Sequence, residues 1–507
     1  MSDHPAPVNV ADLVSRAAAA SGDKVALIHP AGSVTWAELD RRVDAGAVGL
    51  LALGLQAGDR VALALGNTPD FPVAYFAVLR AGLVAVPVNT AYTPAELGHV
   101  LADSGARLLV ASRTGAAGAL EATAALGHPV RVLVTGVDDA PEGTSPFDIV
   151  LDTAGAPAPA AGGEDLAVVL YTSGTSGRPK GAMLSHRALL ANLEQCSRIA
   201  PPVVAPDDVV LLVLPMFHVY GLNGALGMVA WHGATGVLVE RFDPVDTLED
   251  IRRHGVTNVV GAPPMYVAWS MLPDVGDALS TVRLVLSGAA PLPPDVLHRV
   301  LDVSGHHVFE GYGLTETSPV LTSTLMSEVA KAGSIGRPVP GVALRLLDEQ
   351  GREVEEGDPG EIVVRGANLF SGYWPDGADG PDPHGWWATG DVAYADADGD
   401  LHLVDRRREL ILVSGFNVYP REVEDVLAGH PDVAEAAVLG VAHPYTGESV
   451  KAVVVLRQGA RVTAEDLIAH CAASLARFKC PTAVEFVTDL PHSATGKVSK
   501  GRLREAG

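Results

Sequence analysis

The sequence predicts an α/β fold: a large N-terminal domain of parallel-rich α/β sheets plus a β subdomain, followed by a small α+β C-terminal domain. Over the first 330 residues, short apolar runs alternate with helix-start signals, the pattern of parallel sheets covered by helices on both faces. From about residue 333 onward, turn signals crowd between short strands, as they do in antiparallel hairpins. Beyond residue 410 a new strand and helix pattern begins. The 507 residues, 48% of them hydrophobic, can fill several cores.

The helix-start signals of the first domain are capping boxes, in which a Thr side chain and a Glu three residues later satisfy the first amides of a helix. Thr35 with Glu38 has this spacing, and so does Thr93 with Glu96. Pro94 stands at the first helical position, where a missing N–H costs nothing. Buried strands are predicted at the apolar runs 61–65, 107–111, 166–171, 209–214, 258–260 and 282–286.

The later elements follow the same logic. Turns are predicted at 348–351, 356–359 and 396–399, with a strand at 361–365. In the C-terminal part we expect helices at 422–429 and from Thr463 to about Ala476, and strands at 437–441 and 452–456. We place the domain boundary at a hinge, which gives residues 1–405, 406–409 and 410–507.

Charge and cysteine content exclude several function classes. Lys and Arg total 36 against 60 Asp and Glu, a formal charge of −24, which repels nucleic acid and anionic membranes. Three cysteines outside any CxxC pair cannot form a disulfide framework. The first residues lack a signal-peptide pattern, and the most apolar stretch, 224–239, is broken by His232 and glycines. We therefore expect a cytoplasmic protein with no nucleic-acid partner and no transmembrane segment.

The strongest functional signal is the segment Tyr171–Gly181 (YTSGTSGRPKG), which directly follows a predicted strand. Its glycines let backbone amides approach an anion, its hydroxyls add donors, and its lysine adds a positive charge. In an acidic chain, this is the local set of donors that a polyphosphate site requires. The orders GxxxxGK[ST], GxGxxG and GxSxG are absent, and a merely flexible loop seldom follows a buried strand. The candidate phosphate-binding residues are Thr172, Ser173, Gly174, Thr175, Ser176 and Lys180.

The second signal is Glu310–Thr317 (EGYGLTET). Gly311 and Gly313 give backbone access, and Tyr312 offers an aromatic face to a nucleotide base. Glu316 offers the hard oxygens that Mg²⁺ prefers. Taken alone, these residues fit a glycine-rich turn beside a solvated glutamate equally well.

Two further motifs are weak alone. Asp391, in the segment WATGD, can accept hydrogen bonds from both hydroxyls of a ribose, although Thr-Gly-Asp is usually a turn. Lys497 ends the segment LPHSATGK, where a solvated lysine is the ordinary interpretation. The four motifs gain their weight by occurring together, in this order.

Together the motifs make the chain resemble the adenylate-forming superfamily of acyl-CoA synthetases, aryl and fatty acid CoA ligases, peptide-synthetase adenylation domains and firefly luciferase. The resemblance extends from about Ala11 to Arg504. It implies that His218, in PMFHVY, lies between the adenylate and the acyl group. For the nucleotide, it implies an adenine wall at Gly288, Ala289 and Ala290 and further contacts at Glu310, Gly311, Tyr312, Gly313 and Thr315. It implies ribose contacts at Asp391 and Arg406. Gly415 would lie beside the pantetheine path, and Lys497 would be the lysine that activates adenylation.

The resemblance implies an acid–thiol ligase that uses ATP and Mg²⁺ to convert a fatty or aryl acid to an acyl-adenylate and then transfers the acyl group to coenzyme A. The implied catalytic residues are Lys497, His218, Thr315 and Glu316, and Glu316 is also the implied metal ligand. A mobile C-terminal domain would exchange Lys497 for the Gly415 segment between the two half-reactions.

The acyl pocket is expected to be apolar. Segments 219–229, 286–292 and 318–325 carry no charge, which favours an uncharged tail. Tyr220 and Asn223 can orient a ring hydroxyl. Relatives that adenylate α-amino acids carry an aspartate near the position of His218, and its absence here argues against an amino acid substrate.

Three alternatives stay open at this stage. The acyl group can pass to a carrier-protein phosphopantetheine instead of coenzyme A, or to an amine or nitrite. The chain can also be a nucleotide-binding regulatory protein without catalysis. The expected partners are a small carboxylic acid, ATP and coenzyme A, with a homodimer left open.

Overall fold

The computed structural model describes residues 6–136, 140–153, 155, 161–172, 179–406, 409, 411–413, 416–443, 447–492 and 497–506. The chain forms two compact units: the first comprises Met1–Ala332, Gly336–Ala343 and Arg365–Trp386, and the second comprises Gly333–Ile335, Leu344–Val364 and Trp387–Gly507. The predicted α/β fold class is confirmed. The β subdomain clusters with the C-terminal residues, and the hinge at 406–409 stays a prediction.

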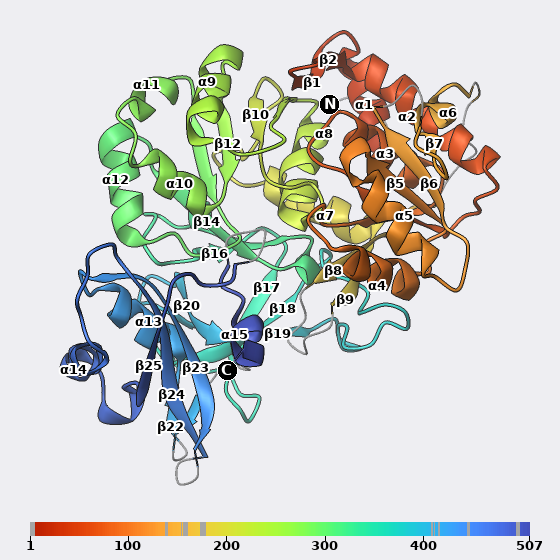
Figure 1. The fold of residues 1–507 in the computed structure, drawn as a ribbon. Coiled ribbons are helices and arrows are strands. Elements are labelled where there is room, and N and C mark those ends of the chain that lie inside the picture. The colour runs from red at the N-terminus through yellow and green to blue at the C-terminus, as the bar shows by residue number, and fades with distance from the viewer. Residues whose placement is uncertain are drawn as a thin grey trace. The chain divides into compact units, whose positions relative to one another are not determined.

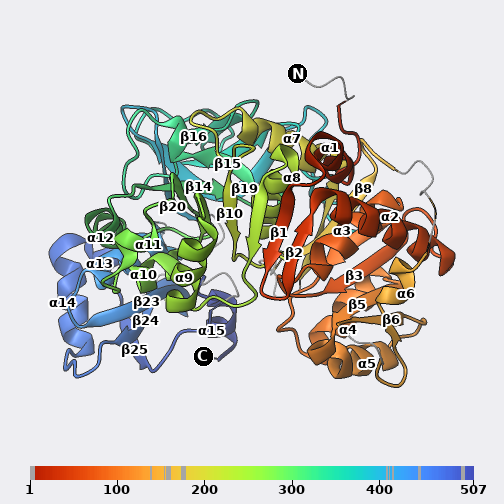
Figure 2. The same cartoon turned by 90° about the horizontal axis from the view of Figure 1, so that it is seen from above.

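A seven-stranded sheet organises the first part of unit 1. Its order is β7-β6-β5-β3-β4-β8-β9, and all neighbours are parallel except β8 and β9. Figure 2 shows α2 (Trp36–Ala52) and α3 (Asp70–Arg80) on one side of its strands and α4 (Pro94–Ser104) and α5 (Ala116–Ala124) on the other. The strands are β3 (Arg60–Ala64), β4 (Val84–Pro87), β5 (Leu108–Ser112), β6 (Arg131–Thr135), β7 (Ser145–Pro146), β8 (Leu166–Thr172) and β9 (Lys180–Ser185).

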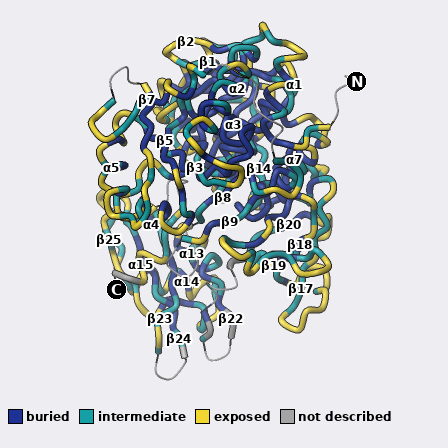
Figure 3. The backbone as a smooth tube through the Cα atoms, turned by 90° about the vertical axis from the view of Figure 1, so that its right-hand side faces the viewer, coloured by how far each residue is buried: buried dark blue, intermediate teal, exposed yellow. Residues whose placement is uncertain are grey.

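Continuous apolar strands make this sheet a buried one. Side chains alternate between faces along a strand, so in β5 Leu109 and Ala111 pack toward Leu101 of α4 and Ala119 of α5. Every residue of α3 from Phe71 to Arg80 is buried, and Figure 3 shows the buried backbone concentrated around this helix. The predicted two-sided covering of the sheet is therefore confirmed.

A nine-stranded sheet forms the rest of unit 1, in the order β16-β15-β14-β13-β12-β10-β11-β1-β2. Its six central strands, from β14 to β1, are parallel. Helices α9 (Pro244–His254), α10 (Pro263–Trp269), α11 (Val275–Ala278) and α12 (Pro294–Ser304) connect successive strands and lie together (Figure 1). The strands are β1 (Val25–His29), β2 (Gly32–Thr35), β10 (Val209–Leu212), β11 (Thr235–Leu238), β12 (Asn258–Gly261), β13 (Leu284–Ser287), β14 (Val308–Gly313), β15 (Val320–Ser323) and β16 (Arg337–Pro338).

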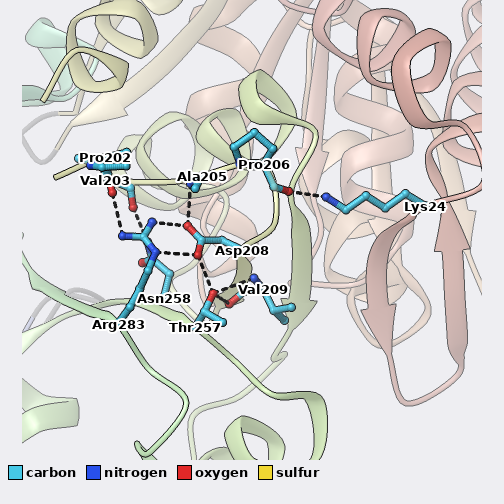
Figure 4. A network of polar contacts seen from close by, with 10 residues as sticks. All are labelled: Lys24, Pro202, Val203, Ala205, Pro206, Asp208, Val209, Thr257, Asn258 and Arg283. Atoms are coloured by element: carbon cyan, nitrogen blue, oxygen red, sulfur yellow. Dashed lines mark hydrogen bonds and ion pairs between the residues drawn. The ribbon is translucent and has the colours of Figure 1, made fainter. Parts of the chain in front are cut away.

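A polar network closes the amino ends of the central strands in this sheet (Figure 4). The buried Asp208 carboxylate accepts hydrogen bonds from Arg283 Nε at 2.8 Å, Thr257 Oγ1 at 2.8 Å and Ala205 N at 2.7 Å. Burial alone would raise the pKa of Asp208, but these hydrogen bonds lower it below its ordinary value. Because ligand sites of parallel sheets lie at the carboxyl ends, this network serves stability.

Unit 2 contains a four-stranded sheet in the order β17-β18-β19-β20, in which β19 pairs antiparallel with both β18 and β20. The predicted turns are present: Gly351 N donates to Asp348 O and Gly399 N donates to Asp396 O, each at a positive φ that favours glycine. The predicted antiparallel subdomain is thus confirmed. Its strands are β17 (Ala343–Leu347), β18 (Gly360–Arg365), β19 (Trp387–Ala395) and β20 (Leu401–Arg406).

The C-terminal sheet of unit 2 is covered on both faces. Helices α13 (Pro420–Ala428) and α14 (Ala464–Ser474) pack on one face through Val423, Leu427 and Leu467. On the other face Leu503, from α15 (Lys500–Ala506), packs against Ala437, Leu439 and Val453. The strands are β21 (Ile411–Val413), β22 (Phe416–Val418), β23 (Val433–His443), β24 (Gly447–Leu456) and β25 (Ala483–Val487).

One predicted capping box is complete and one is only half formed. Thr93 and Glu96 bond reciprocally at the start of α4. Thr35 accepts a hydrogen bond from Glu38 N, but the expected second bond, donated by Thr35 N–H to the Glu38 carboxylate, is not formed. The reason is that Thr35 ends β2 and its backbone pairs with Val25 of β1.

The apolar stretch 224–239 does not form one long helix. It covers the second half of a π-helical turn (η2, Tyr220–Gly227), then α8 (Met228–His232) and β11. Within the described part of the chain, none of the helices has the length and apolar character needed to span a membrane.

Candidate active site

In the sequence, the predicted phosphate loop connects β8 to β9. Thr172 pairs with Lys180 in this hairpin, and Thr172 Oγ1 donates to Lys180 O at 3.5 Å. Ser173, Gly174, Thr175 and Ser176 lie outside the described residues. Beyond β9, Ser185 caps helix α7 (His186–Ser197) by accepting a hydrogen bond from Ala188 N. The described residues on either side of the loop segment are therefore regular: β8 precedes it, and β9 and α7 follow it.

Glu316 occupies a short 3₁₀ turn (η3, Thr315–Thr317) that follows β14. The residue is buried, at 7% exposure, and its Oε1 accepts a hydrogen bond from Tyr373 Oη at 2.6 Å. The Phe370 amide donates to Glu316 O at 2.9 Å. The Thr315 side chain belongs to the same buried turn.

Both motifs are held by residues 366–379, which we call the strap. Trp374 N donates to Gly181 O at 2.7 Å and Met183 N donates to Gly372 O at 3.0 Å, so the strap runs along β9. Lys180 Nζ lies 3.0 Å from Asp379 Oδ2 and 4.9 Å from the ring centroid of Tyr373. The strap thus contacts Lys180 and Glu316 at once.

Sequence reasoning missed the strap. The available signal was the run Ser371-Gly-Tyr-Trp374, where a glycine beside aromatic residues indicates a close backbone approach. Gly372 has φ +96°, and a Cβ there would lie 2.1 Å from Gly377 O. Only glycine fits that bend.

Three buried asparagines hold the backbone that follows Glu316. Asn368 Nδ2 donates to Thr317 O at 2.8 Å, Asn223 Nδ2 to Ser318 O at 2.7 Å, and Asn192 Nδ2 to Val320 O at 2.8 Å. They come from the strap, from η2 and from α7 respectively. We call this set the amide brace.

Gln195 links two members of the amide brace, Asn192 and Asn368. Gln195 accepts from Asn192 Nδ2 and donates to Asn368 Oδ1, each at 3.2 Å. Because Asn223 Nδ2 also donates to Leu189 O at 3.1 Å, both protons of that amide are engaged within the fold. The predicted role of Asn223 in orienting a ring hydroxyl was therefore wrong as far as its N–H groups are concerned.

The remaining residues of the Glu310 motif lie on β14. Glu310 is buried, and its Oε1 accepts a hydrogen bond from Leu292 N at 2.9 Å, which fixes the segment after β13. A Cβ on Gly313 would lie 1.8 Å from Pro319 O, so this glycine is required by the packing of the turn. Gly311 and Tyr312 pair with Ser323 and Thr322 of β15.

The predicted adenine wall follows the carboxyl end of β13. Gly288 N donates to Gly261 O, and a Cβ on Gly288 would lie 2.7 Å from the Tyr220 ring. Ala289 has φ +69°, a left-handed conformation that costs an L-residue energy and is found most often at functional sites. Ala290 follows it directly.

His218 lies in the loop after β10, which the buried Asn67 holds. Asn67 Nδ2 donates to Leu212 O and Leu214 O, and Met216 N donates to Asn67 Oδ1. His218 Nδ1 accepts a hydrogen bond from Tyr220 N at 3.3 Å, so the neutral ring carries its proton on Nε2. Burial raises the pKa of Tyr220 above its ordinary value, and its phenol stays protonated.

Unit 2 carries the other predicted residues. Asp391 is buried on β19, where its amide donates to Thr389 Oγ1 at 3.1 Å and its backbone pairs with Arg406 of β20. Lys497 is exposed and precedes α15. Gly415 lies outside the described residues.

Glu316 is the one predicted metal ligand, and its surroundings fit Mg²⁺. Across the described residues, no three His, Cys, Asp or Glu side chains gather into a metal-binding group. Mg²⁺ in nucleotide sites is typically held by one or two carboxylates together with phosphate oxygens. Glu316, a single buried carboxylate that the strap links to Lys180, matches that pattern.

The chain belongs to the AMP-binding enzymes, the adenylate-forming superfamily. It matches the AMP-binding enzyme family over residues 14–374 and the AMP-binding enzyme C-terminal domain over residues 422–497. It is 37% identical to a long-chain-fatty-acid–CoA ligase of Yersinia pestis, over 97% of this chain and 93% of that protein. It is 39% identical to a feruloyl-CoA synthase of Amycolatopsis sp., over 96% and 97%. Among solved structures, ATP-bound MatB from Rhodopseudomonas palustris is 36% identical, with a TM-score of 0.89 and coverage of 98% and 99%.

Proposed function

We propose that this enzyme uses ATP to activate a fatty or aryl carboxylic acid as an acyl-adenylate and transfers the acyl group to coenzyme A, which releases AMP and pyrophosphate. One observation carries the proposal: in a chain of the AMP-binding family, the strap contacts both Glu316 and Lys180, the lysine of the predicted phosphate-loop segment. The names of its relatives, which are CoA ligases of fatty and aromatic acids, agree with this class of reaction.

In the first half-reaction, a carboxylate oxygen of the acid attacks the α-phosphorus of ATP, and the bond to pyrophosphate breaks. Because the carboxylate and the triphosphate are both anions, the residues around them must offset their negative charge. Lys180 and the hydroxyls from Thr172 to Ser176 would hold the phosphates, and Thr315 would add a donor. When bound at Glu316, Mg²⁺ would neutralise phosphate charge. Lys497 would supply charge toward the α-phosphate.

In the second half-reaction, the thiol of coenzyme A attacks the acyl carbonyl carbon and AMP leaves. This step needs no protein nucleophile. We propose that residues 410–507 turn about the hinge at 406–409 relative to residues 1–405, so that the segment with Gly415 replaces Lys497. Asp391 and Arg406 would hold the ribose throughout.

We propose an apolar acyl pocket near Tyr220 and His218. The uncharged segments around these residues support an apolar tail, since burying an unpaired carboxylate or ammonium costs several kcal/mol (about 3 or more). The His218 Nε2–H can donate to an oxygen of the acyl-adenylate. Tyr220, with its protonated phenol, remains available to a ring hydroxyl.

The acceptor is tested by product analysis with coenzyme A, a holo-carrier protein, an amine or nitrite as the sole acceptor. We expect an acyl-CoA thioester with coenzyme A and at least tenfold less product with any other acceptor. A faster reaction with carrier protein, amine or nitrite would replace coenzyme A in the proposal. Absence of acid-dependent ATP–pyrophosphate exchange would favour a regulatory nucleotide-binding protein.

We also propose that the enzyme is cytoplasmic, since ATP and coenzyme A are available there. The three cysteines, Cys196, Cys471 and Cys480, are all buried and form no disulfide, as suits a reducing compartment.

Sedimentation velocity would test the homodimer left open by the sequence.

A further inference from the structure

Tyr373 connects the two charged groups that the proposed function places around the triphosphate of ATP. Its hydroxyl donates to Glu316 Oε1 at 2.6 Å, and its ring centroid lies 4.9 Å from Lys180 Nζ. The ring is also fixed from a third direction, because it packs edge-to-face against Phe370 with centroids 5.1 Å apart. One aromatic side chain therefore contacts both a carboxylate and an ammonium group.

The hydroxyl contact restricts a carboxylate that has lost most of its water. Glu316 is 7% exposed, so a hydrogen bond to its oxygen is worth more than one at the surface. Its backbone is fixed separately, by the Phe370 amide on Glu316 O and by Asn368 on Thr317 O. With the backbone held, the Tyr373 hydroxyl sets the remaining freedom of the side chain.

The ring contact bears on Lys180. Its ammonium faces the ring of Tyr373 and also pairs with Asp379 at 3.0 Å. The side chains of Lys180 and Asp379 are 44% and 67% exposed, so their salt bridge is weak and can open for a phosphate. The aromatic face attracts the ammonium group and orients it. The ring carries no net charge, so the positive charge of Lys180 stays available to a phosphate.

We propose that Tyr373 is a positioning residue that sets the carboxylate of Glu316 and the ammonium of Lys180 toward the phosphates of ATP. The inference rests on the proposed function for the identity of the ligand. It assigns separate tasks to two parts of one side chain. The hydroxyl acts through Glu316, and hence on the step that depends on Mg²⁺, whereas the ring acts through Lys180.

Two substitutions separate these tasks. Tyr373→Phe keeps the ring and removes the hydroxyl, and Tyr373→Leu removes both. A hydrogen bond to a charged group is worth about a tenfold to hundredfold change in an equilibrium or a rate. We expect Tyr373→Phe to bind ATP in EDTA within about twofold of wild type, but to lose about tenfold or more of the affinity measured in Mg²⁺, because only the Glu316 contact is lost. Tyr373→Leu should weaken ATP binding under both conditions.

A double-mutant cycle supplies the decisive measurement. Calorimetric ATP binding and acid-dependent ATP–pyrophosphate exchange are measured for Tyr373→Phe, Glu316→Gln and the double variant. If Tyr373 acts through Glu316, the double variant should be no worse than Glu316→Gln. The matched control is Tyr75→Phe, which removes one hydroxyl from the core helix α3 and should leave ATP binding unchanged.

Two results would overturn the inference: wild-type behaviour of Tyr373→Phe in Mg²⁺, or losses in Tyr373→Phe and Glu316→Gln that add in the double variant. Equal loss of ATP affinity with and without Mg²⁺ in Tyr373→Phe would also count against it, since a general structural defect gives that pattern. If wild-type protein binds ATP but shows no exchange with any acid, the proposed function fails, while the calorimetric cycle still decides the role of Tyr373.

Discussion

Single residues carry the charge chemistry of this enzyme, and Lys497 is the simplest to test. It is exposed and lies just before α15. We predict that Lys497→Ala lowers acyl-adenylate formation by about 10²–10³-fold, the usual cost of removing one charge-stabilising donor. Thioester formation from pre-made acyl-adenylate should be spared. Single-turnover assays of the two half-reactions measure this, and equal losses in both would contradict the assignment.

Some residues of the site could be predicted from the sequence and others could not, and the difference has a physical reason. Lys180 and Glu316 could be predicted from the sequence because each stands inside a run of glycines and hydroxyl side chains whose local pattern indicates an anion site. Tyr373 was not, because its partner Glu316 is 57 positions away in the chain and nothing near Tyr373 marks it as a hydrogen-bond donor. Asn223 was misjudged for the same reason, since its carbonyl partners belong to other segments.

At the scale of elements, helix α7 joins the phosphate-loop hairpin to the turn that carries Glu316. Its residue Asn192 donates to Val320 O at 2.8 Å and accepts from Val320 N at 3.1 Å. We predict that Asn192→Leu destabilises the fold by about 3 kcal/mol, because two partly buried backbone groups, the N–H and C=O of Val320, lose their partners. Urea unfolding measures this change.

The matched control for that prediction is Glu194→Ala on the exposed side of α7, which should change stability by no more than about 0.5 kcal/mol. If Asn192→Leu were as stable as Glu194→Ala, the amide brace would contribute little to the fold. Its function would then have to lie elsewhere.

The first residue of α7 makes the stability of unit 1 depend on pH. His186 is fully buried, its Nδ1 accepts from Val10 N at 3.1 Å, and burial lowers its pKa to about 4. The unfolded chain, with a histidine pKa near 6.5, binds the proton more readily. The contribution of neutral His186 is therefore complete above about pH 6.5 and is lost as the pH falls toward 4.

We predict a loss of about 2.5 kcal/mol in unfolding free energy between pH 7.5 and 4.5 from His186 alone. His186→Asn keeps an acceptor near the Nδ1 position without a titrating ring, and its pH dependence should be weaker by that amount. Urea titrations at the two pH values make the comparison. Parallel pH profiles for wild type and variant would show that His186 is not the cause.

Elements were predicted best where one physical rule dominates. Continuous apolar runs gave β3, β5, β8, β10, β12 and β13, because strands buried on both faces need no alternation. The π-helical turn η2 was not predicted, since its run Tyr220–Gly227 is uncharged, rich in glycine and without a helical period. Such turns occur frequently at functional sites, and this one begins with Tyr220.

At the scale of the whole molecule, one chain must serve two half-reactions with different requirements. Adenylation needs a positive charge near the α-phosphate, and thioester formation needs an open path for the thiol. We propose that the hinge at 406–409 exchanges Lys497 for the segment with Gly415. We predict that Gly415→Leu keeps ATP–pyrophosphate exchange but loses acyl-CoA formation, because a side chain there would obstruct the path of the thiol. Normal thioester formation in that variant would remove Gly415 from the path.

The most direct test of the central claim is acid-dependent ATP–pyrophosphate exchange by the wild-type enzyme across a panel of acids. The panel holds fatty acids of increasing length, cinnamate, malonate and glycine. An apolar acid gains about 0.8 kcal/mol for each methylene it buries, so kcat/KM should rise with chain length or ring area until the pocket is full. Malonate and glycine should be at least about a hundredfold worse, since each brings an unpaired charge into the pocket. A profile in which malonate or glycine outperforms octanoate and cinnamate, or in which no acid supports exchange, would contradict the account.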